Sequence, residues 1–316
     1  GIQFKGIHAK SSEAKTDESV YAEIVAQAKN IDLYTIMPTS EEFKEILDDA
    51  FYTQEEPFSS PSVIMQYFVM KKAKELGCIV MLDGQGGDET LLGYAWYYPA
   101  YLLSFNPFKS VIALFQSFIH SSLSLKELIA YLFYFPSYKI RRWRQRNKCF
   151  FLKDELFNDF DWLRKHSQSY YSISELQEIE IYNTQLPHLL KCEDRNSMRH
   201  SIEARLPFLD YRLLEIALSI NAHYKMKKGW TKYILRKAME GILPYEILWR
   251  KSKLGFAAPD KTWINSISQE INQVIRGSHI IEAISKKPID LKTLEMGMIW
   301  RLYSIAKWES IYNVRF

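Results

Sequence analysis

The spacing of apolar residues changes several times along the first hundred positions. Short runs rich in β-branched and aromatic residues predict strands at residues 3–8 and 31–36. Between them, apolar residues recur every three or four positions and predict a helix over residues 18–29. A second helix is expected after Thr39, because Glu42 stands three positions later and the two residues form the signature of a capping box.

The next two elements lead to the most informative part of the chain. Ser60 and Pro61 predict the start of a helix, and Gly77 predicts its end. Residues 78–82 are all apolar, which is typical of a parallel strand buried on both faces. Strands that alternate with helices indicate an α/β fold built on a parallel, doubly wound sheet. We expect this α/β part to occupy residues 1–97.

The rest of the chain, residues 98–316, has helical spacing and few strand signals. Its most apolar run, residues 128–135, is far shorter than the ~20 residues needed to span a bilayer, and it predicts a buried helix. Residues 139–148 (KIRRWRQRNK) predict a basic helix. We expect a large, mainly helical region that packs against the sheet.

Composition excludes several classes of protein. The net charge of +4 is too small to imply nucleic acid as a partner. The basic helix could hold a phosphate backbone, but a solvated helix face is the favoured interpretation because no aromatic stacking platform accompanies it. No signal peptide opens the chain, and no membrane partner is expected. Three separated cysteines argue against disulfides and zinc and favour a cytoplasmic location (Cys78, Cys149 and Cys192).

A glycine-rich loop follows the apolar strand. Residues 83–89 read DGQGGDE and hold three of the chain's 12 glycines. In open parallel sheets, ligands bind beyond the carboxyl ends of the strands, and glycines let the backbone approach a ligand. The carboxylates of Asp88 and Glu89 are oxygen ligands of the kind that Mg²⁺ prefers. The alternative for the same residues is a tight turn and a helix N-terminus that favours acidic side chains.

A second cluster mixes charged and apolar residues over positions 190–210. Asp194 and Arg195 stand on a predicted helix, and Glu203 and Arg205 follow it. Such a mixture predicts a paired, partly buried charge network. The alternative is a structural ion pair between Glu203 and Arg205 that locks a loop.

Lys232 belongs to a third cluster, which opens with Gly229. We expect this lysine in the first turn of a helix, where a cation opposes the helix dipole. The position is unfavourable unless the amine holds an anion. A solvated surface lysine is the alternative interpretation.

These clusters, in this order, resemble the synthetase domain of glutamine-dependent asparagine synthetases. The pattern of that family is a Ser-Gly-Glu/Gln-Gly-Ala/Ser-Asp-Glu loop, then Asp-Arg-x-Ser-Met and Glu-x-Arg-x-Pro-Phe-Leu-Asp, then Lys-x-x-Leu-Arg. The chain has DGQGGDE, followed by DRNSM at 194–198, EARLPFLD at 203–210 and KYILR at 232–236. The resemblance covers roughly residues 16–263.

The resemblance implies an adenine nucleotide alpha hydrolase-like fold and a chemistry. ATP and Mg²⁺ activate a carboxylate, here expected to be aspartate, as an acyl-adenylate, and ammonia from a separate glutaminase domain then forms the amide. The resemblance implies that Asp88 holds the metal and that Lys232 neutralises the leaving pyrophosphate. We therefore expect Asp88, Glu89 and Lys232 to converge on one cleft, with Glu203 and Arg205 near it. The resemblance also implies that Glu89 faces the substrate and that Gln85 occupies the place of a candidate base. The implied nucleotide contacts come from the remaining loop residues (Asp83, Gly84, Gly86 and Gly87).

Three departures qualify this picture. Gln85 stands where many family members have glutamate, and a neutral amide does not accept a proton. Asp83 replaces the usual serine and puts a carboxylate near phosphates. The pyrophosphate-binding loop of the family, Ser-Gly-Gly-x-Asp-Ser, is not found in the chain.

We expect the missing loop, with its strand and helix, to lie before Gly1, so that the sheet is incomplete at its N-terminus. The cysteine nucleophile of the glutaminase half is absent as well. The chain as given is therefore expected to bind ATP weakly or not at all. The alternative function is a catalytically silent fragment or binding module that retains the fold.

Overall fold

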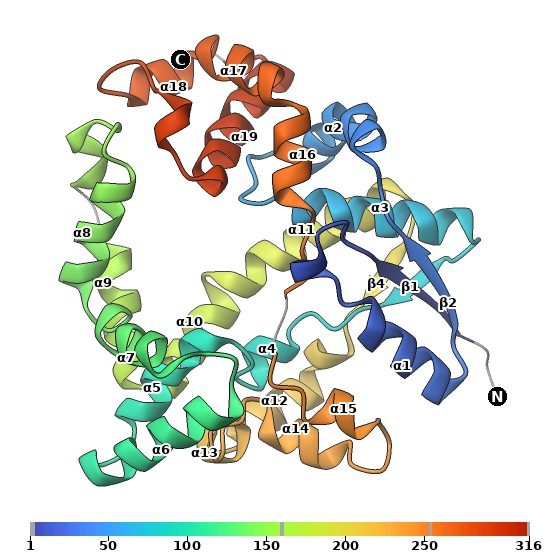
Figure 1. The fold of residues 1–316 in the computed structure, drawn as a ribbon, viewed down its shortest axis with the longest axis vertical. Helices are drawn as coiled ribbons and strands as arrows, with labels where there is room; N and C mark the ends of the chain where they lie inside the picture. Colours follow the sequence, from blue (N-terminus) through green and yellow to red (C-terminus); the bar gives the residue numbers. More distant parts are fainter. Residues whose placement is uncertain (1–3, 159–160, 253–254, 315–316) are drawn as a thin grey trace.

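A computed structural model describes residues 4–158, 161–252 and 255–314. Helices make up most of it, and the strands lie together with α1 (Ser19–Lys29) on one side of the molecule (Figure 1). β1 (Lys5–Ala9) and β2 (Asp32–Ile36) are linked by α1 and pair in parallel. β3 (Val80–Leu82) pairs in parallel with β4 (Glu203–Arg205). The fold is therefore α/β with parallel strands, as the alternating pattern predicted.

The predicted doubly wound sheet is not formed by the described residues, whose strands make two separate two-stranded sheets. The expectation of a strand buried on both faces at residues 78–82 is wrong. Ile79 is 74% exposed and Leu82 61% exposed. The physical reason is that a parallel strand is buried on both faces where helices cover both faces of its sheet, and β3 lies in a sheet of only two described strands, which offers little surface for such helices. An apolar sequence alone does not bury a strand that has one neighbour.

The helices that follow β2 start and stop where local signals place them. α2 (Ser40–Gln54) begins behind a complete capping box: the Glu42 amide donates to Thr39 Oγ1 at 3.1 Å, and the Thr39 amide donates to Glu42 Oε2 at 2.8 Å. α3 (Ser62–Glu75) ends just before Gly77, whose φ of 72° is in the left-handed region. These two predictions are confirmed.

The largest core joins α2 and α3 to the C-terminal helices. Phe43 of α2 stacks on Trp263 with ring centroids 4.6 Å apart, and the buried rings of Phe51, Phe58 and Trp300 continue the cluster. The last quarter of the chain is therefore packed on the first. The helices concerned are α16 (Asp260–Ser266), α17 (Ser268–Arg276), α18 (His279–Ile284) and α19 (Met296–Tyr312).

A second core, rich in tyrosine, lies among α5 (Tyr98–Leu103), α7 (Leu125–Tyr134) and α10 (Ile173–Tyr182). The expectation of a buried helix at residues 128–135 is wrong, because α7 buries only Leu128 fully and Phe133 is 65% exposed. None of the described helices is long and apolar enough to cross a bilayer. The other helices are α4 (Gly87–Thr90), α6 (Pro107–His120), α8 (Tyr138–Lys148), α9 (Asp161–Gln168), α11 (Gln185–Arg199), α12 (Tyr211–Ser219), α13 (Ala222–Lys225), α14 (Tyr233–Ala238) and α15 (Tyr245–Leu248). Short 3-10 helices span Ala14–Thr16, Ala95–Tyr97, Asp154–Phe157, Ser169–Tyr171, Pro207–Leu209 and Leu291–Thr293.

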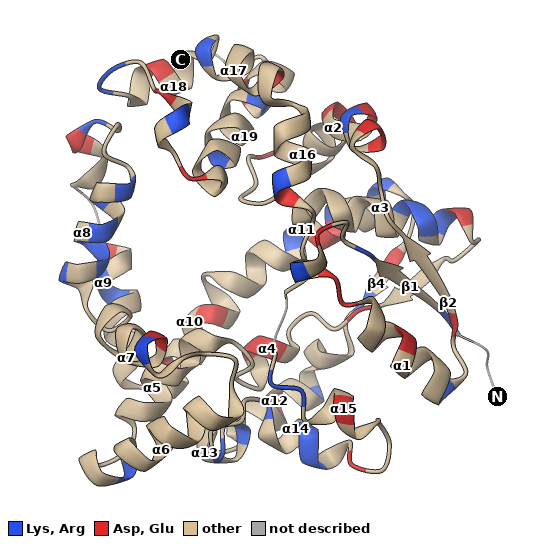
Figure 2. Cartoon of the chain, viewed as in Figure 1, with Lys and Arg blue, Asp and Glu red and all other residues tan. Residues whose placement is uncertain are grey.

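Charged side chains are spread unevenly over these elements (Figure 2). The predicted basic helix is α8, which carries lysines and arginines and no acidic residue. Acidic residues gather instead at α2 and in the loop and helix that follow β3.

Candidate active site

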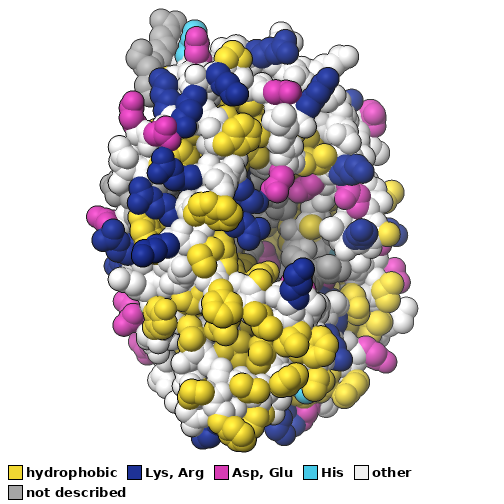
Figure 3. All heavy atoms as spheres, turned by 60° about the vertical axis from the view of Figure 1, so that its left-hand side comes forward, with side chains coloured by type: hydrophobic (Ala, Val, Ile, Leu, Met, Phe, Trp, Pro, Cys, Tyr) yellow, Lys and Arg dark blue, Asp and Glu magenta, His cyan; other side chains and the backbone are white. Residues whose placement is uncertain are grey.

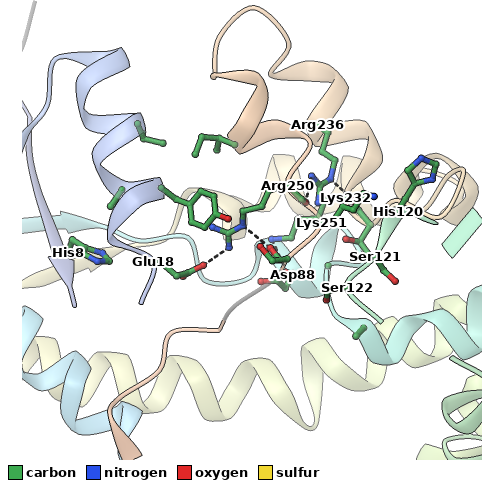
Figure 4. A pocket seen from close by; sticks show the side chains of 18 of the residues that line it. His8, Glu18, Asp88, His120, Ser121, Ser122, Lys232, Arg236, Arg250 and Lys251 are labelled. Carbon is green, nitrogen blue, oxygen red and sulfur yellow. Dashed lines mark hydrogen bonds and ion pairs between the residues drawn. The ribbon is translucent and has the colours of Figure 1, made fainter. Parts of the chain in front are cut away.

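A cavity of about 680 Å³ lies between the β1–α1 unit and the helices α14 and α15. Its wall also includes the segment that follows β3, with Asp88 and Gly93, and the loop after α6, with Ser121. Segments far apart in the sequence thus meet around one space (Figure 4). This cavity is the candidate active site.

Lys232 and Asp88 form an ion pair at the centre of the cavity wall, with Nζ 2.9 Å from Oδ1 (Figure 4). Both side chains are about three-quarters buried. The expected convergence on one cleft therefore holds for Asp88 and Lys232 and is wrong for Glu89, which is buried and does not line the cavity. Lys232 is the N-cap of α14, with a left-handed φ of 50°, so it precedes the first turn in which the sequence placed it. Asp88 lies in the first turn of α4.

Gly93 explains how the pair approaches so closely. A Cβ atom at this position would lie 1.8 Å from Asp88 Oδ1 and 2.3 Å from the Cε atom of Lys232. Any side chain at this position would push the ends of Asp88 and Lys232 out of the places that they occupy now, so glycine permits the contact in its present geometry. The Gly-Tyr step that follows the Asp-Glu pair in the sequence is therefore part of the site.

The cavity carries an excess of basic side chains. Arg236 and Arg250 line it beside Lys232 and Lys251, whereas Glu18 and Asp88 are the acidic groups among the lining residues. A space with this balance suits an anion with several negative charges.

Hydrogen bonds to the backbone hold Arg236 in place, since its Nε donates to the carbonyl of Thr231 at 2.8 Å and its Nη1 to that of Leu248. Arg250 pairs with Glu18 and lies over the ring of Tyr21, 4.1 Å from its centroid. Sequence reasoning did not assign either arginine to the site. The signal that could have found them is the basic pair at 250–251 and the arginine at the end of the KYILR motif.

The loop residues Asp83 and Gln85 line a second, smaller cavity of about 280 Å³ between β1 and β3. His8 and Glu18 belong to the walls of both cavities, so the two are adjacent. Glu89 lines neither of them. It is 1% exposed, and its Oε1 accepts a hydrogen bond from the Tyr94 hydroxyl at 2.7 Å.

The glycines of this loop pack against the second motif. Gly86 has a φ of 83°, and a Cβ on it would lie 2.2 Å from the side chain of Leu209. A Cβ on Gly87 would lie 3.1 Å from the ring of Phe208. Close packing on residues 207–209 therefore accounts for both glycines, whereas Gly84 has open space around it. Their predicted nucleotide contacts stay predictions.

The predicted charge network is not gathered in the cavity. Glu203 Oε1 and Arg205 Nε are 2.9 Å apart, so the two residues pair as expected, but both side chains are exposed and line neither cavity. The expected place of this pair at the cleft is therefore corrected. The reason is that β4 runs beside β3: the Asp83 amide donates to the Arg205 carbonyl at 3.1 Å, and the side chains point to solvent.

The helical half of the network has other partners. Arg195 Nη2 lies 2.8 Å from Glu55 Oε2, which joins α11 to the C-terminal end of α2. Asp194 accepts from the Ser197 hydroxyl through its backbone carbonyl. Neither Asp194 nor Arg195 lines the cavities, so both serve the structure around the site.

A buried carboxylate that sequence reasoning missed stands next to the loop. Glu193 is 1% exposed, and neither of its carboxylate oxygens has a hydrogen-bond partner of ordinary geometry among the described residues. Burial and the neighbouring Asp83 carboxylate raise the pKa of Glu193 to about 8. At neutral pH this pair therefore holds a proton.

Two buried residues, Gln177 and Lys225, hold α4 in place through a chain of hydrogen bonds. The Gln177 amide donates to the carbonyls of Glu89 at 2.8 Å and Thr90 at 2.7 Å. Lys225 donates to the Gln177 side-chain oxygen at 2.8 Å and to the Ala217 carbonyl at 2.9 Å. Lys225 is 1% exposed, and desolvation lowers its pKa to about 8. This chain of hydrogen bonds fixes the helix that carries Asp88.

Comparison with known proteins shows which proteins the chain is similar to. Residues 2–308 match the sequence profile described as asparagine synthase. Among curated proteins, the chain is 29% identical to asparagine synthetase [glutamine-hydrolyzing] 1 of Bacillus subtilis, over 92% of this chain and 49% of that protein. It is 26% identical to asparagine synthetase B [glutamine-hydrolyzing] of Escherichia coli over 47% of this chain and 27% of that protein. The chain thus spans at most about half the length of these relatives. Because the profile covers nearly all of its residues, the chain belongs to the asparagine synthase family.

Proposed function

We propose that the chain is the synthetase part of an asparagine synthetase-like enzyme, which uses ATP to activate a carboxylate, aspartate in the first instance, for amide formation. The observation that carries the proposal is the Lys232–Asp88 pair, set in a basic cavity beyond the end of β3. An ion pair that served only the structure would not require further positive charges beside it, so additional cations in the same wall favour a site for an anion. Here Arg236, Arg250 and Lys251 share the same wall.

In this proposal the phosphates of ATP occupy the basic cavity. Lys232 neutralises the negative charge that grows on the pyrophosphate as it leaves, and this stabilises the transition state more than the bound substrate. Arg236 is held by backbone carbonyls, so its guanidinium is positioned before the ligand arrives. Without a phosphate, the Asp88 carboxylate serves as the counter-ion of Lys232.

The residues present fit Mg²⁺ if the nucleotide supplies the other ligands. The described residues include no cluster of three histidine, cysteine or acidic side chains that could hold a metal alone. Mg²⁺ commonly binds through one or two carboxylates plus substrate phosphates, which is the donor set that Asp88 and ATP offer. Asp88 would hold the ion, and the ion would supply charge neutralisation at the phosphates.

The amide-forming half of the reaction needs ammonia and a proton acceptor. The relatives are named glutamine-hydrolysing, and this part of the proposal assigns the glutaminase activity to a partner outside this chain. Gln85 cannot take the proton that ammonia loses, because its amide is neutral. Glu89, which the resemblance put on the substrate side, is buried, lines neither cavity and accepts from the Tyr94 hydroxyl, so the proposal gives it a structural role and assigns no residue as the proton acceptor.

A catalytically silent role is the second candidate, and one observation favours it. Asp83 and Glu193 place two carboxyl groups beside the loop where the nucleotide backbone contacts are proposed. Negative charge there opposes phosphate binding.

Exchange of labelled pyrophosphate into ATP, measured with aspartate, Mg²⁺ and the purified chain, separates the two candidates. The synthetase proposal predicts exchange that depends on the carboxylate and falls at least about a hundredfold in Lys232→Met, as for loss of one transition-state contact. Lys237→Met is the matched control, because Lys237 lies on the same helix and is exposed. Absence of exchange over a panel of carboxylates, with the protein folded, would support the silent alternative instead.

A further inference from the structure

α6 turns its small residues toward the core and its large apolar residues toward solvent, which is the reverse of an ordinary surface helix. Its two fully buried residues are small, Ala113 and Ser117, whereas its large apolar residues point outward. Phe108 is 77% exposed and Phe115 is 52% exposed. A surface helix normally buries its large apolar residues and leaves polar ones in water. The outward side of α6 therefore has the composition of a buried face.

The exposed apolar surface extends from α6 onto α7. The two helices are neighbours, and Ile129 and Phe133 are exposed on α7. Figure 3 shows hydrophobic side chains gathered over the lower part of this face. We call this surface the apolar face, and it consists of Phe108, Val111, Ile112, Phe115, Phe118, Ile119, Ile129 and Phe133.

Basic side chains border the apolar face along α8 and α9. Arg144 lies over the ring of Tyr134 of α7, 5.1 Å from its centroid, so α8 is attached to α7 at this point. Figure 3 shows basic side chains clustered beside the hydrophobic ones on the same side of the molecule. Arg146 and Lys148, at the end of α8, are exposed but pair with Asp154 and Glu295. We call the other exposed bases of these two helices the basic flank, and it consists of Lys139, Arg144, Arg164 and Lys165.

The charge of the segment that forms α6, α7 and α8 is one-sided in the sequence as well, whereas α9 and the segment before it also carry acidic residues. Residues 105–150 contain eight lysines and arginines and a single acidic residue, Glu127. Trp143 is exposed in the middle of α8, between basic residues. Large apolar side chains bordered by lysine, arginine and tryptophan are the composition of surfaces that lie at the boundary between water and lipid.

We propose that this side of the protein docks on an anionic lipid surface, with the apolar face at the level of the headgroups and the basic flank against lipid phosphates. An anionic bilayer satisfies both halves of the surface at once. It removes exposed phenylalanine and isoleucine from water, and it attracts the lysines and arginines beside them. A second copy of the chain would instead bring two basic flanks together, which is electrostatically unfavourable.

Co-sedimentation with vesicles tests the proposal. The full chain is mixed with vesicles of phosphatidylcholine alone or of phosphatidylcholine with about 30% phosphatidylglycerol, over a range of lipid concentrations. We expect binding to the anionic vesicles that weakens as salt rises, and little binding to the neutral ones. Phe108→Glu combined with Phe115→Glu should lower the partition coefficient at least about tenfold, since both rings are lost from the lipid. Lys139→Glu with Lys165→Glu should lower it by about as much and flatten the salt dependence.

Matched variants keep the result interpretable. Tyr245→Glu changes a residue of similar exposure, 75%, on α15, outside the apolar face, and should bind vesicles as the unmodified chain does. Unchanged circular dichroism would show that the glutamate variants are folded, and Phe133→Glu provides a second change on α7. Equal binding by all variants, or none to anionic vesicles, overturns the proposal. Two other results would also overturn it. The first is a dimer, seen by sedimentation velocity, that Phe115→Glu dissociates while the chain does not bind vesicles. The second is binding to DNA that the phenylalanine changes do not weaken.

Discussion

The Nζ atom of Lys232 lies 2.9 Å from the Oδ1 atom of Asp88, and Gly93 leaves just enough space for the contact. The two residues come from the third and the first of the sequence clusters. No local interaction brings them together, so the fold itself assembles the pair. Two further arginines in the same cavity wall give the pair its basic setting.

Replacement of Gly93 tests whether that space is required. We expect Gly93→Ala to push Asp88 and Lys232 apart and to lower the free energy of unfolding by about 1–3 kcal/mol, because the added methyl overlaps both side chains. Urea denaturation measures this change.

Gly297→Ala is the control for this change. Gly297 lies on α19, and a Cβ added there would meet no neighbouring atom within 4 Å. The free energy of unfolding should therefore stay level or rise by up to about 1 kcal/mol. Equal effects of both changes would contradict the packing argument.

Gln177 gives a second prediction. Gln177→Leu removes the side-chain amide that donates to the backbone carbonyls of Glu89 and Thr90 and accepts from Lys225. We expect the free energy of unfolding to fall by about 2–4 kcal/mol. The neighbouring Glu178 is exposed, so Glu178→Gln should change it by less than about 0.5 kcal/mol. A small effect of Gln177→Leu would show that α4 does not depend on this support.

Local elements could be predicted from the sequence because their signals are local. The capping box at Thr39 and the basic character of α8 depend on residues within a few positions of each other. The burial of residues 78–82 could not be predicted in the same way. It depends on how many strands stand beside β3, and no residue in the apolar run carries that information.

The site was predictable to the extent that motifs mark it. Asp88 and Lys232 stand in such motifs, and they meet. The burial of Lys225 and Glu193 could not be predicted. A lysine or a glutamate in a helix is normally exposed, and only the packing of other helices buries these two. Glu203 and Arg205 show the opposite case, in which a conspicuous charge pattern forms an exposed pair on β4.

The buried Glu193 predicts a pH dependence of stability. Its folded-state pKa, about 8, lies above the value of 4.5 for an unfolded glutamate, so the folded state keeps its proton over a range in which the unfolded state releases it. Stability should therefore fall as pH rises from about 4.5 to 8, by up to about 4 kcal/mol from this residue.

Glu193→Gln removes this titration, so the variant should gain stability over the original chain as pH rises through that window. Urea unfolding at a series of pH values measures it. The exposed Glu215→Gln is the control and should leave the pH profile unchanged. Parallel profiles for the original chain and Glu193→Gln would show that Glu193 is ionised in the folded protein.

Calorimetric titration of Mg²⁺ and ATP into the chain, Lys232→Met and Lys237→Met measures whether Lys232 and Asp88 form a phosphate and Mg²⁺ site. The account predicts saturable binding to the original chain, weaker than low-micromolar because the Ser-Gly-Gly-x-Asp-Ser loop is missing. It predicts at least about tenfold weaker binding in Lys232→Met, a loss of about 1.4 kcal/mol, and no change in Lys237→Met. Binding of equal strength by the original chain and Lys232→Met, or no binding at all, would contradict it.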